Sequence, residues 1–221
     1  MDAASFIQPT SFAIVVGGTL IATFLRCGPK DCSLALAALA GFGQKRFDAE
    51  AAKAELAAQV RAIQQDGLLR ANPRHFGDRE FDDVTDALIG TRSVEALVKT
   101  HEEHKRHRQI TDERAVRTLA QAAELAPVFG LAGTLISLTQ LPSDGIAREA
   151  YMSAISMGVL STLYGLLLAN LVFAPLSRMV ERIAATEERE RQKIVDWLAD
   201  QVTPVIPKHG KPVSLHEAAA R

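Results

Sequence analysis

The sequence predicts an all-α, polytopic membrane protein with three transmembrane helices and a large helical cytoplasmic insert. Of its 221 residues, 48% are hydrophobic and only 5% aromatic, and the abundant Ala and Leu favour helices. The 25 Lys+Arg and 26 Asp+Glu residues are absent from three runs, residues 3–25, 125–143 and 150–177. Since a bilayer core about 30 Å thick is crossed by roughly 20 apolar residues in a helix, each run is long enough to span it.

The first run is predicted to be a retained span. Its clearly apolar part covers residues 12–25, and no Lys or Arg precedes it, so the basic start of a signal peptide is absent. Arg26 stands before Cys27, where a lipoprotein signal would carry a small residue. The alternative for all three runs is a set of buried helices in a large soluble core, although residues 150–177 are long for such a helix.

The basic residues give an orientation and a division of the chain. Sixteen Lys/Arg lie in residues 26–117 and eight in residues 178–221, whereas only Arg148 lies between the second and third runs. Positively charged loops stay in the cytoplasm, so both basic regions are expected there. The expected parts are a first transmembrane helix (1–26), a cytoplasmic helical insert (27–117), a transmembrane hairpin (118–177) and a cytoplasmic helix with a tail (178–221). The net charge of −1 argues against a nucleic-acid partner.

Helical patterns fill the predicted cytoplasmic parts. Within the insert we expect helices over residues 35–42, 51–63, 81–99 and 110–123, the last beginning at Thr111, with a break at Asn72 and Pro73. Residues 179–198 form a charged helical pattern whose apolar positions are Ile183, Ile194, Trp197 and Leu198.

Two motifs in these parts invite a chemical interpretation. His101 and His104 are three residues apart, not four as in the zinc motif His-Glu-x-x-His, and with His107 they are expected to form a solvated face. Cys27 and Cys32 have no second pair to complete a zinc site, so we expect unligated thiols. No nucleophile–base motif and no phosphate-binding glycine loop is present in the sequence, so we do not expect an enzyme, a metal site or a cofactor.

The three uncharged runs offer hydroxyl groups but no titratable group at depth. Thr134 lies about ten residues into the second run, and Ser161 and Thr162 lie near the middle of the third. Hydroxyls can donate to a partner's carboxylate or coordinate a partly dehydrated cation. Alternatively, they bond to their own helix or join neighbouring helices. A proton path would need a carboxylate from another chain.

Glycine, alanine and proline also mark the second and third runs. Small residues allow close helix packing and suit a tightly packed oligomer; they are Gly130, Gly133, Ala154, Gly158 and Gly165. Pro127 and Pro175 each remove a backbone hydrogen bond near the cytoplasmic end of a span. Each is therefore a candidate hinge between a pore and the insert.

Four segments resemble the MotA family of flagellar stator subunits, within the wider MotA/TolQ/ExbB group of ion-driven motors. In one-letter code they are IVVGGTL (14–20), ELAPVFGLAGTL (124–135), LSTLYG (160–165) and NLVFAPL (170–176). The resemblance covers roughly residues 10–203. The usual member of this family has one more transmembrane span, which would precede the first span of this chain.

The resemblance implies a pentamer that surrounds two copies of a single-span MotB-like partner carrying the membrane aspartate. It places Thr134 and Thr162 on the ion path, adds a hydroxyl at Ser161, and puts Glu124 near the cytoplasmic exit. It also matches Pro127 and Pro175 to the two family prolines. The transported cation is expected to be H⁺, with Na⁺ as the alternative, because sodium-type members resemble Thr-Thr where this chain has Ser161 and Thr162.

The rotor-facing charges of the family would fall around residues 64–68. There Gln64 and Gln65 stand where the family has a basic pair, and Arg61, Arg70 and Arg74 are near but displaced. We therefore expect an ion-channel and torque-generating subunit of a rotary motor in the cell inner membrane, working on a rotor or another cytoplasmic protein. The alternatives are a non-flagellar motor with the same 5:2 composition and a non-conducting membrane scaffold.

Overall fold

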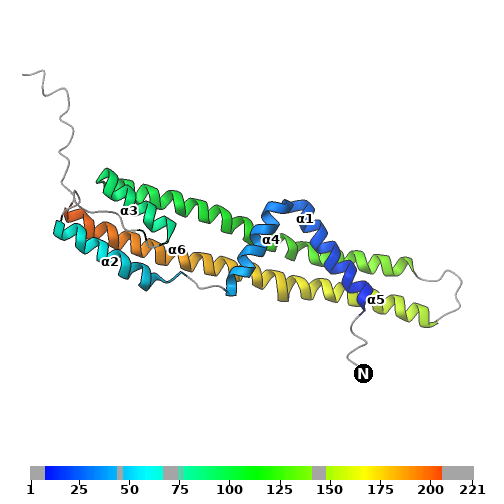
Figure 1. The fold of residues 1–221 in the computed structure, drawn as a ribbon. Helices are drawn as coiled ribbons and strands as arrows, with labels where there is room; N and C mark the ends of the chain where they lie inside the picture. The colour runs from blue at the N-terminus through cyan, green and yellow to red at the C-terminus, as the bar shows by residue number, and fades with distance from the viewer. Residues whose placement is uncertain (1–7, 44–46, 67–74, 76, 141–147, 206–221) are drawn as a thin grey trace, which may run out of the picture. The chain divides into compact units, whose positions relative to one another are not determined.

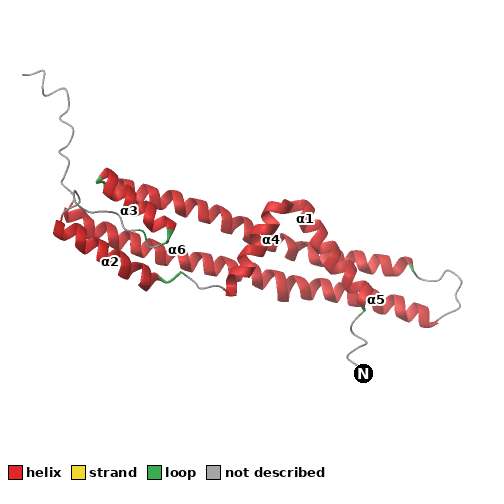
Figure 2. Cartoon of the chain, viewed as in Figure 1, coloured by secondary structure: helices red, strands yellow, loops and turns green. Residues whose placement is uncertain are grey.

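The computed structural model describes residues 8–43, 47–66, 75, 77–140 and 148–205. Within them every regular element is helical and no strand occurs (Figure 2), which confirms the predicted all-α class. The helices are α1 (Pro9–Ala40), α2 (Ala49–Asp66), α3 (Arg79–Thr91), α4 (Val94–Thr139), α5 (Arg148–Leu167) and α6 (Ala174–Val202). A π-helical segment (Leu168–Phe173) joins α5 to α6, and short 3₁₀ turns follow α1 and α6.

Three helical stretches are long and apolar enough to cross a membrane, namely Pro9–Ala40, Val94–Thr139 and Tyr151–Val202. The predicted number of spans is therefore confirmed. Each covers most of one uncharged run, and the apolar surface of the runs is largely uncovered: Leu25 is 77% exposed, Leu135 65% and Leu171 70%. Lipid or other chains would cover such surface in a membrane.

The chain divides into two compact units, each described here by itself. The first unit comprises Met1–Lys45 and Arg108–Thr186, and the second comprises Arg46–His107 and Glu187–Arg221. α4 and α6 contribute residues to both units (Figure 1).

In the first unit α1 is sharply bent (Figure 1). Gly28 has φ 82° and ψ 166°, which is far from helical, and Pro29 begins the second half of the helix. Glycine adopts this backbone conformation without steric cost, and proline suits the first turn of a helix because its missing N–H has no partner there. The predicted helix over 35–42 is the end of this second half, which stops at Ala40.

In the first unit α1 contacts both α5 and α4, through aromatic rings, a hydroxyl group and a glycine. The Phe12 and Tyr164 rings meet edge to face with centroids 6.1 Å apart. The Ser11 hydroxyl faces the Met157 carbonyl at 3.4 Å. Gly18 of α1 leaves room for the Phe129 ring of α4, whose atoms would clash with a Cβ at position 18.

The second unit has a core of large apolar side chains. α2, α3, α4 and α6 contribute to one buried cluster of Ala52, Leu56, Val60, Ile63, Phe81, Val84, Leu88, Leu97, Ile194, Val195, Leu198 and Val202. Ile194 and Leu198 are thus buried, and Trp197 packs against the cluster, as their predicted apolar positions require. Full burial of one such side chain stabilises a fold by about 1.5–3 kcal/mol.

Two predicted helix boundaries are wrong. The helical pattern over 81–99 is divided, because Arg92 takes a left-handed conformation (φ 56°, ψ 34°) that ends α3 before α4 begins at Val94. Conversely, no helix begins at Thr111, which lies inside the continuous α4. The predicted break at Asn72 and Pro73 lies outside the described residues.

Candidate functional site

The predicted ion-path hydroxyls Thr134 and Thr162 meet between α4 and α5. Their Oγ1 atoms are 2.7 Å apart. The Thr134 hydroxyl also lies 3.0 Å from the Gly158 carbonyl oxygen and 3.2 Å from that of Gly130, and the Thr162 hydroxyl lies 3.3 Å from the Gly158 oxygen. Two hydroxyls and two carbonyls therefore converge in one small volume, which we call the hydroxyl cluster.

The chemistry of the hydroxyl cluster follows from its proton count. Each hydroxyl supplies one proton and two lone pairs, and each carbonyl only accepts. Four oxygens thus share two protons, so the cluster has spare acceptor capacity and each hydroxyl can turn its proton toward another group. Both threonine side chains are only partly buried, so a group from another chain can reach them.

Glycines bring the two backbones together at the hydroxyl cluster. A Cβ atom at Gly158 would lie 2.7 Å from the Ser137 Oγ and 3.3 Å from the Thr134 Cγ2. A Cβ at Gly130 would lie 3.0 Å from the Ser161 carbonyl oxygen. The small residues noted in the sequence therefore set the spacing on which the hydroxyl contacts depend.

Ser161 lies beside Thr162 in sequence but does not join these hydrogen bonds. It is fully buried, and its Oγ has no hydrogen-bond partner among the residues that the structure describes. A Cβ at Gly133 would lie 2.8 Å from that Oγ, so the side chain points at the glycine face of α4. The structure thus separates the two hydroxyls that the sequence groups together, and a role for Ser161 on the ion path stays a prediction.

Glu124 is exposed on α4, ten residues before Thr134. Ten residues of helix span about 15 Å, so its carboxylate is not part of the hydroxyl cluster. No ion pair joins Glu124 to another described residue.

The two candidate hinge prolines differ in their surroundings. Pro127 lies inside the uninterrupted α4, and its Cα would be 3.2 Å from a Cβ at Gly165, so it belongs to a tight helix contact. Pro175 is exposed and follows the π-helical segment, where the Ala174 N–H bonds to the Ala169 carbonyl. Proline has no N–H and crowds the carbonyl four residues earlier, which explains the wider helical turn before it.

The predicted rotor-facing residues are only partly described. Arg61, Gln64 and Gln65 are exposed near the end of α2, and the Gln64 amide donates to the Gln201 carbonyl at 3.4 Å. Arg70 and Arg74 lie outside the described residues.

The expected solvated face of histidines is wrong for His101. Its side chain is 1% exposed, and its Nδ1 lies 2.6 Å from the Glu80 Oε1. His101 follows the buried Leu97 by one helical turn, and this spacing is the signal that could have predicted its burial. His104 is partly exposed and pairs with Asp83 at 2.9 Å.

No group of three or more metal-ligating side chains occurs among the described residues, and Cys27 and Cys32 are free thiols.

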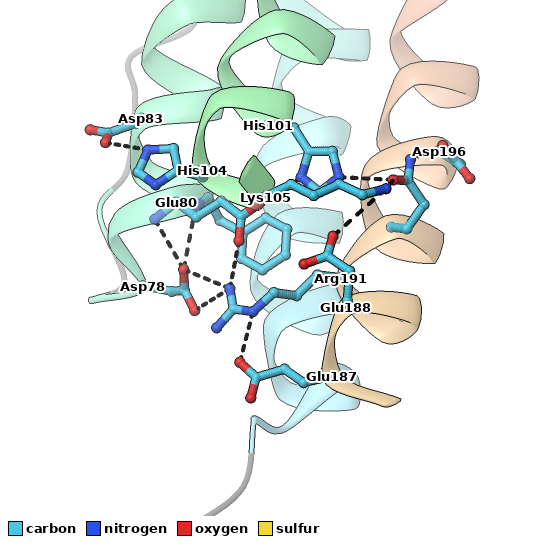
Figure 3. A network of polar contacts seen from close by, with 12 residues as sticks. Asp78, Glu80, Asp83, His101, His104, Lys105, Glu187, Glu188, Arg191 and Asp196 are labelled. Carbon is cyan, nitrogen blue, oxygen red and sulfur yellow. Dashed lines mark hydrogen bonds and ion pairs between the residues drawn. The ribbon is translucent and has the colours of Figure 1, made fainter. Parts of the chain in front are cut away.

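Arg191 is the centre of an ion-pair network that the sequence did not predict. Its guanidinium bonds to Asp78, Glu80 and Glu187 at 2.8–3.0 Å (Figure 3). The guanidinium carbon also lies 4.1 Å from the centroid of the Phe47 ring. Burial alone would lower the pKa of Arg191, but Asp78, Glu187 and Glu80 raise it, so the side chain stays charged. It holds the start of α3, where the Asp78 carboxylate also caps the helix by accepting from the Glu80 and Phe81 N–H groups.

Comparison with known proteins identifies the family. Residues 71–193, more than half of the chain, match the model of the MotA/TolQ/ExbB proton channel family. Motility protein A of Cereibacter sphaeroides is 24% identical over 196 residues, which cover 88% of this chain and 78% of that protein. Chemotaxis protein PomA of Vibrio alginolyticus is 25% identical over 196 residues, which cover 86% of this chain and 76% of that protein.

Solved structures share the fold. A chain in the structure of C. jejuni MotAB superposes with a TM-score of 0.80 at 17% identity, covering 96% of this chain and 89% of that one. A chain in the flagellar MotAB stator complex from Bacillus subtilis gives a TM-score of 0.80 at 17% identity, with 98% and 89% covered. The family match, the three spans and the fold lead to one conclusion: this MotA-like chain belongs to the MotA/TolQ/ExbB proton channel family and is a channel-type membrane protein rather than an enzyme.

Proposed function

We propose that this chain is the ion-channel and torque-generating subunit of an ion-driven rotary motor, a MotA-like flagellar stator subunit of the cell inner membrane. The observation that carries the proposal is the hydroxyl cluster, in which the Thr134 and Thr162 Oγ1 atoms meet at 2.7 Å inside otherwise uncharged spans. Relatives named for motility and for chemotaxis support the flagellar assignment.

The chain would work with a single-span MotB-like partner. Its own uncharged runs contain no Asp, Glu, His, Lys or Arg near their middle, and proton transfer at that depth requires such a titratable group. An aspartate of the partner would supply it, in the 5:2 assembly that the family implies. The uncovered apolar faces of α1, α4 and α5 would then meet lipid, other copies of this chain and the partner.

In this mechanism the hydroxyl cluster eases transfer of the cation to and from the partner's carboxylate. A hydroxyl that turns its proton outward stabilises the charged carboxylate, and its lone pairs accept from the protonated one. H⁺ is the favoured cation, and Na⁺ is the alternative because hydroxyl and carbonyl oxygens also suit Na⁺. Glu124 would lie near the exit, Pro127 and Pro175 would serve as hinges, and residues 27–117 would pass torque to a rotor.

The first test is ion uptake by vesicles that contain this chain together with its partner. Thr162→Val removes one hydroxyl and keeps the shape, so uptake should fall about tenfold or more, since a hydrogen bond to a charged group contributes roughly 1.5–3 kcal/mol. Stability should change little, by about 0.6 kcal/mol, as is usual for hydrogen bonds within membranes. Separate H⁺ and Na⁺ gradients identify the cation.

Thr139→Val provides the matched control. Thr139 is exposed at the end of α4, the helix that carries Thr134, and its hydroxyl donates to the Ile136 carbonyl of that helix, at 2.7 Å. Uptake should stay at the wild-type rate in this variant. Full uptake by the Thr162→Val vesicles would refute a role for the hydroxyl cluster.

A non-flagellar motor of the same family is the second candidate, because Gln64 and Gln65 stand exposed where the resemblance expects a basic pair. Swimming of a deletion strain distinguishes the two motors: a strain that still swims normally points to the non-flagellar one. A non-conducting scaffold would give no ion uptake in the presence of the partner.

A further inference from the structure

The second unit buries one histidine, His101, that the proposed channel does not use. It lies on α4, 24 residues before the uncharged run that starts at Leu125, and its side chain is 1% exposed. Buried histidines need a partner for each polar ring atom, and the identity of those partners reveals the protonation state.

Both ring nitrogens of His101 face oxygen atoms. Nδ1 lies 2.6 Å from the Glu80 Oε1 on α3, and Nε2 lies 3.0 Å from the Gln192 Oε1 on α6. A neutral imidazole has one N–H, so it could donate to only one of these acceptors. Two donated hydrogen bonds require the imidazolium.

Neither acceptor can readily become a donor. The Glu80 carboxylate also accepts from the Arg191 guanidinium at 2.8 Å, and an adjacent cation favours the ionised form of a carboxyl group (Figure 3). The orientation of the Gln192 amide is fixed on its other side. Its Nε2 donates to the Asp196 carboxylate at 2.9 Å, and its Oε1 accepts from the Lys105 ammonium at 2.9 Å. A flipped amide would turn oxygen toward Asp196 and N–H groups toward Lys105, so both contacts would become repulsive.

We propose that His101 is a buried imidazolium that ties α3 and α6 to α4, and that loss of its proton as the pH rises releases the hold of this latch on α6. Deprotonation would remove the proton from Nε2, because the short bond to the Glu80 carboxylate retains the one on Nδ1. The proton passes to water, and the bare Nε2 is left facing the Gln192 oxygen, lone pair against lone pair. The Gln192 side chain then has to withdraw.

The charges around the latch favour the protonated state. The charged and titratable groups of the surrounding network are Asp78 at the N-cap of α3, Glu80 and Asp83 on α3, His104 and Lys105 on α4, and Glu187, Glu188, Arg191 and Asp196 on α6 (Figure 3). Burial lowers the pKa of His101, but the hydrogen bonds to Glu80 and Gln192 and the charges of Glu80 and Glu188 outweigh it, so the pKa is raised above 6.5. A raised pKa stabilises the folded unit fully below pH 6.5, and this stabilisation disappears as pH rises through the folded pKa.

The latch has a consequence for torque that depends on the function proposed above. α3 follows residues 67–74 in sequence, which include Arg70 and Arg74, two of the predicted rotor-facing residues. Loss of the Gln192 contact would loosen α6 against α4 while Glu80 still holds α3, so the packing of the unit that contains these residues would respond to pH. The latch itself is tested without a rotor.

The direct test is magic-angle-spinning NMR of the full chain in lipid with ¹⁵N-labelled histidine. The His101 ring, assigned by its absence in His101→Gln, should show two protonated nitrogens at pH 6.5 and should lose one proton at a pH above 6.5. Gln192→Met removes the Nε2 acceptor and should move this midpoint to lower pH. A neutral ring at pH 6.5, or an unmoved midpoint in Gln192→Met, would overturn the proposal.

The structural response is read from Trp197, the single tryptophan of the chain, which packs on the core of the same unit. Its fluorescence should change at the His101 midpoint in the wild type. The change should disappear in His101→Gln, whose amide can still donate to Glu80. His104→Gln is the matched control, because His104 pairs with Asp83 between the same two helices but is partly exposed, and it should keep the change. Persistence of the change in His101→Gln would show that another group causes it.

Discussion

The two units of the chain use opposite packing chemistry. Large side chains that are fully buried lie almost entirely in the second unit, from Leu56 and Phe81 to Leu198, whereas the first unit contributes Val15 and Thr19. Among the described residues, every large hydrophobic side chain that is exposed belongs to the first unit, with Val98 as the exception. Glycine contacts between helices and a small apolar cluster of Ala35, Leu119 and Val180 hold the first unit together, whereas a buried charge network accompanies the larger apolar core of the second.

The difference follows from the solvent that each unit requires. In lipid, apolar side chains gain nothing from burial, so helices associate through close backbone contact and a few hydroxyl bonds. In water, apolar burial drives folding, and a buried charge is tolerated only when it is paired. The comparison therefore predicts which kind of substitution damages each unit.

The largest effect is expected in the second unit from Arg191→Met. The substitution leaves the carboxylates of Asp78 and Glu80 without their guanidinium partner, and Glu80 is 3% exposed. Unpaired buried charge costs about 3–5 kcal/mol. Hydrogen exchange of the full chain in lipid should show reduced protection of the amides of α3 and α6.

Arg189→Met on the same helix serves as the control, since Arg189 is exposed. Exchange in this variant should match the wild type. Equal protection in both variants would mean that the charge network does not hold the second unit.

An intermediate effect is expected in the first unit from Gly165→Ala. The added Cβ would lie 2.7 Å from the Ala126 carbonyl oxygen and 3.0 Å from the Gly130 Cα, and these backbone atoms cannot move aside cheaply. Overpacking of this kind costs about 1–3 kcal/mol. The thermal midpoint of the solubilised complex should fall, and ion uptake should fall with it because α4 and α5 separate at the hydroxyl cluster.

Gly17→Ala is the same substitution at a glycine of α1 with no atom within 4 Å of the added Cβ. In this variant the thermal midpoint of the complex and the rate of ion uptake should stay near the wild-type values. If Gly17→Ala lowered the thermal midpoint and ion uptake as much as Gly165→Ala, the claim that backbone contact between α4 and α5 stabilises the first unit would be contradicted.

The smallest effect is expected from Arg117→Gln. Arg117 pairs with Glu113 one turn earlier at 3.6 Å, and both side chains are about 70% exposed. Such a pair contributes about 0.3–0.5 kcal/mol, and salt screens it. The thermal midpoint should barely move at low salt and should match the wild type at high salt. A large loss would place this helix face in contact with another chain.

The sequence predicted the membrane part of the fold better than the rest. Long gaps between charges are a strong signal, and the three spans they predict are confirmed. The resemblance, and not periodicity, assigned Thr134 and Thr162 to the ion path. Their contact with each other was not predicted, because hydrophobic periodicity does not show which faces of two apolar helices meet. Ser161 shows the limit: a neighbour in sequence points about 100° away on a helix and has different contacts.

The second unit was only partly predictable. The apolar positions Ile194 and Leu198 follow helical spacing and are buried. His101 and Arg191 were missed because polar residues that pair across helices resemble solvated ones in a single sequence. The end of α3 at Arg92 was missed as well, since a left-handed residue other than glycine leaves no compositional signal.

The central claim is that this chain forms a motor channel only with a carboxylate from a partner, and its most direct test is the native mass of the complex purified from its own host. The account predicts a mass equal to five copies of this chain and two copies of a single-span protein with a membrane aspartate. A mass that corresponds to this chain alone would contradict the account, because the hydroxyl cluster of Thr134 and Thr162 would then have no titratable group to serve.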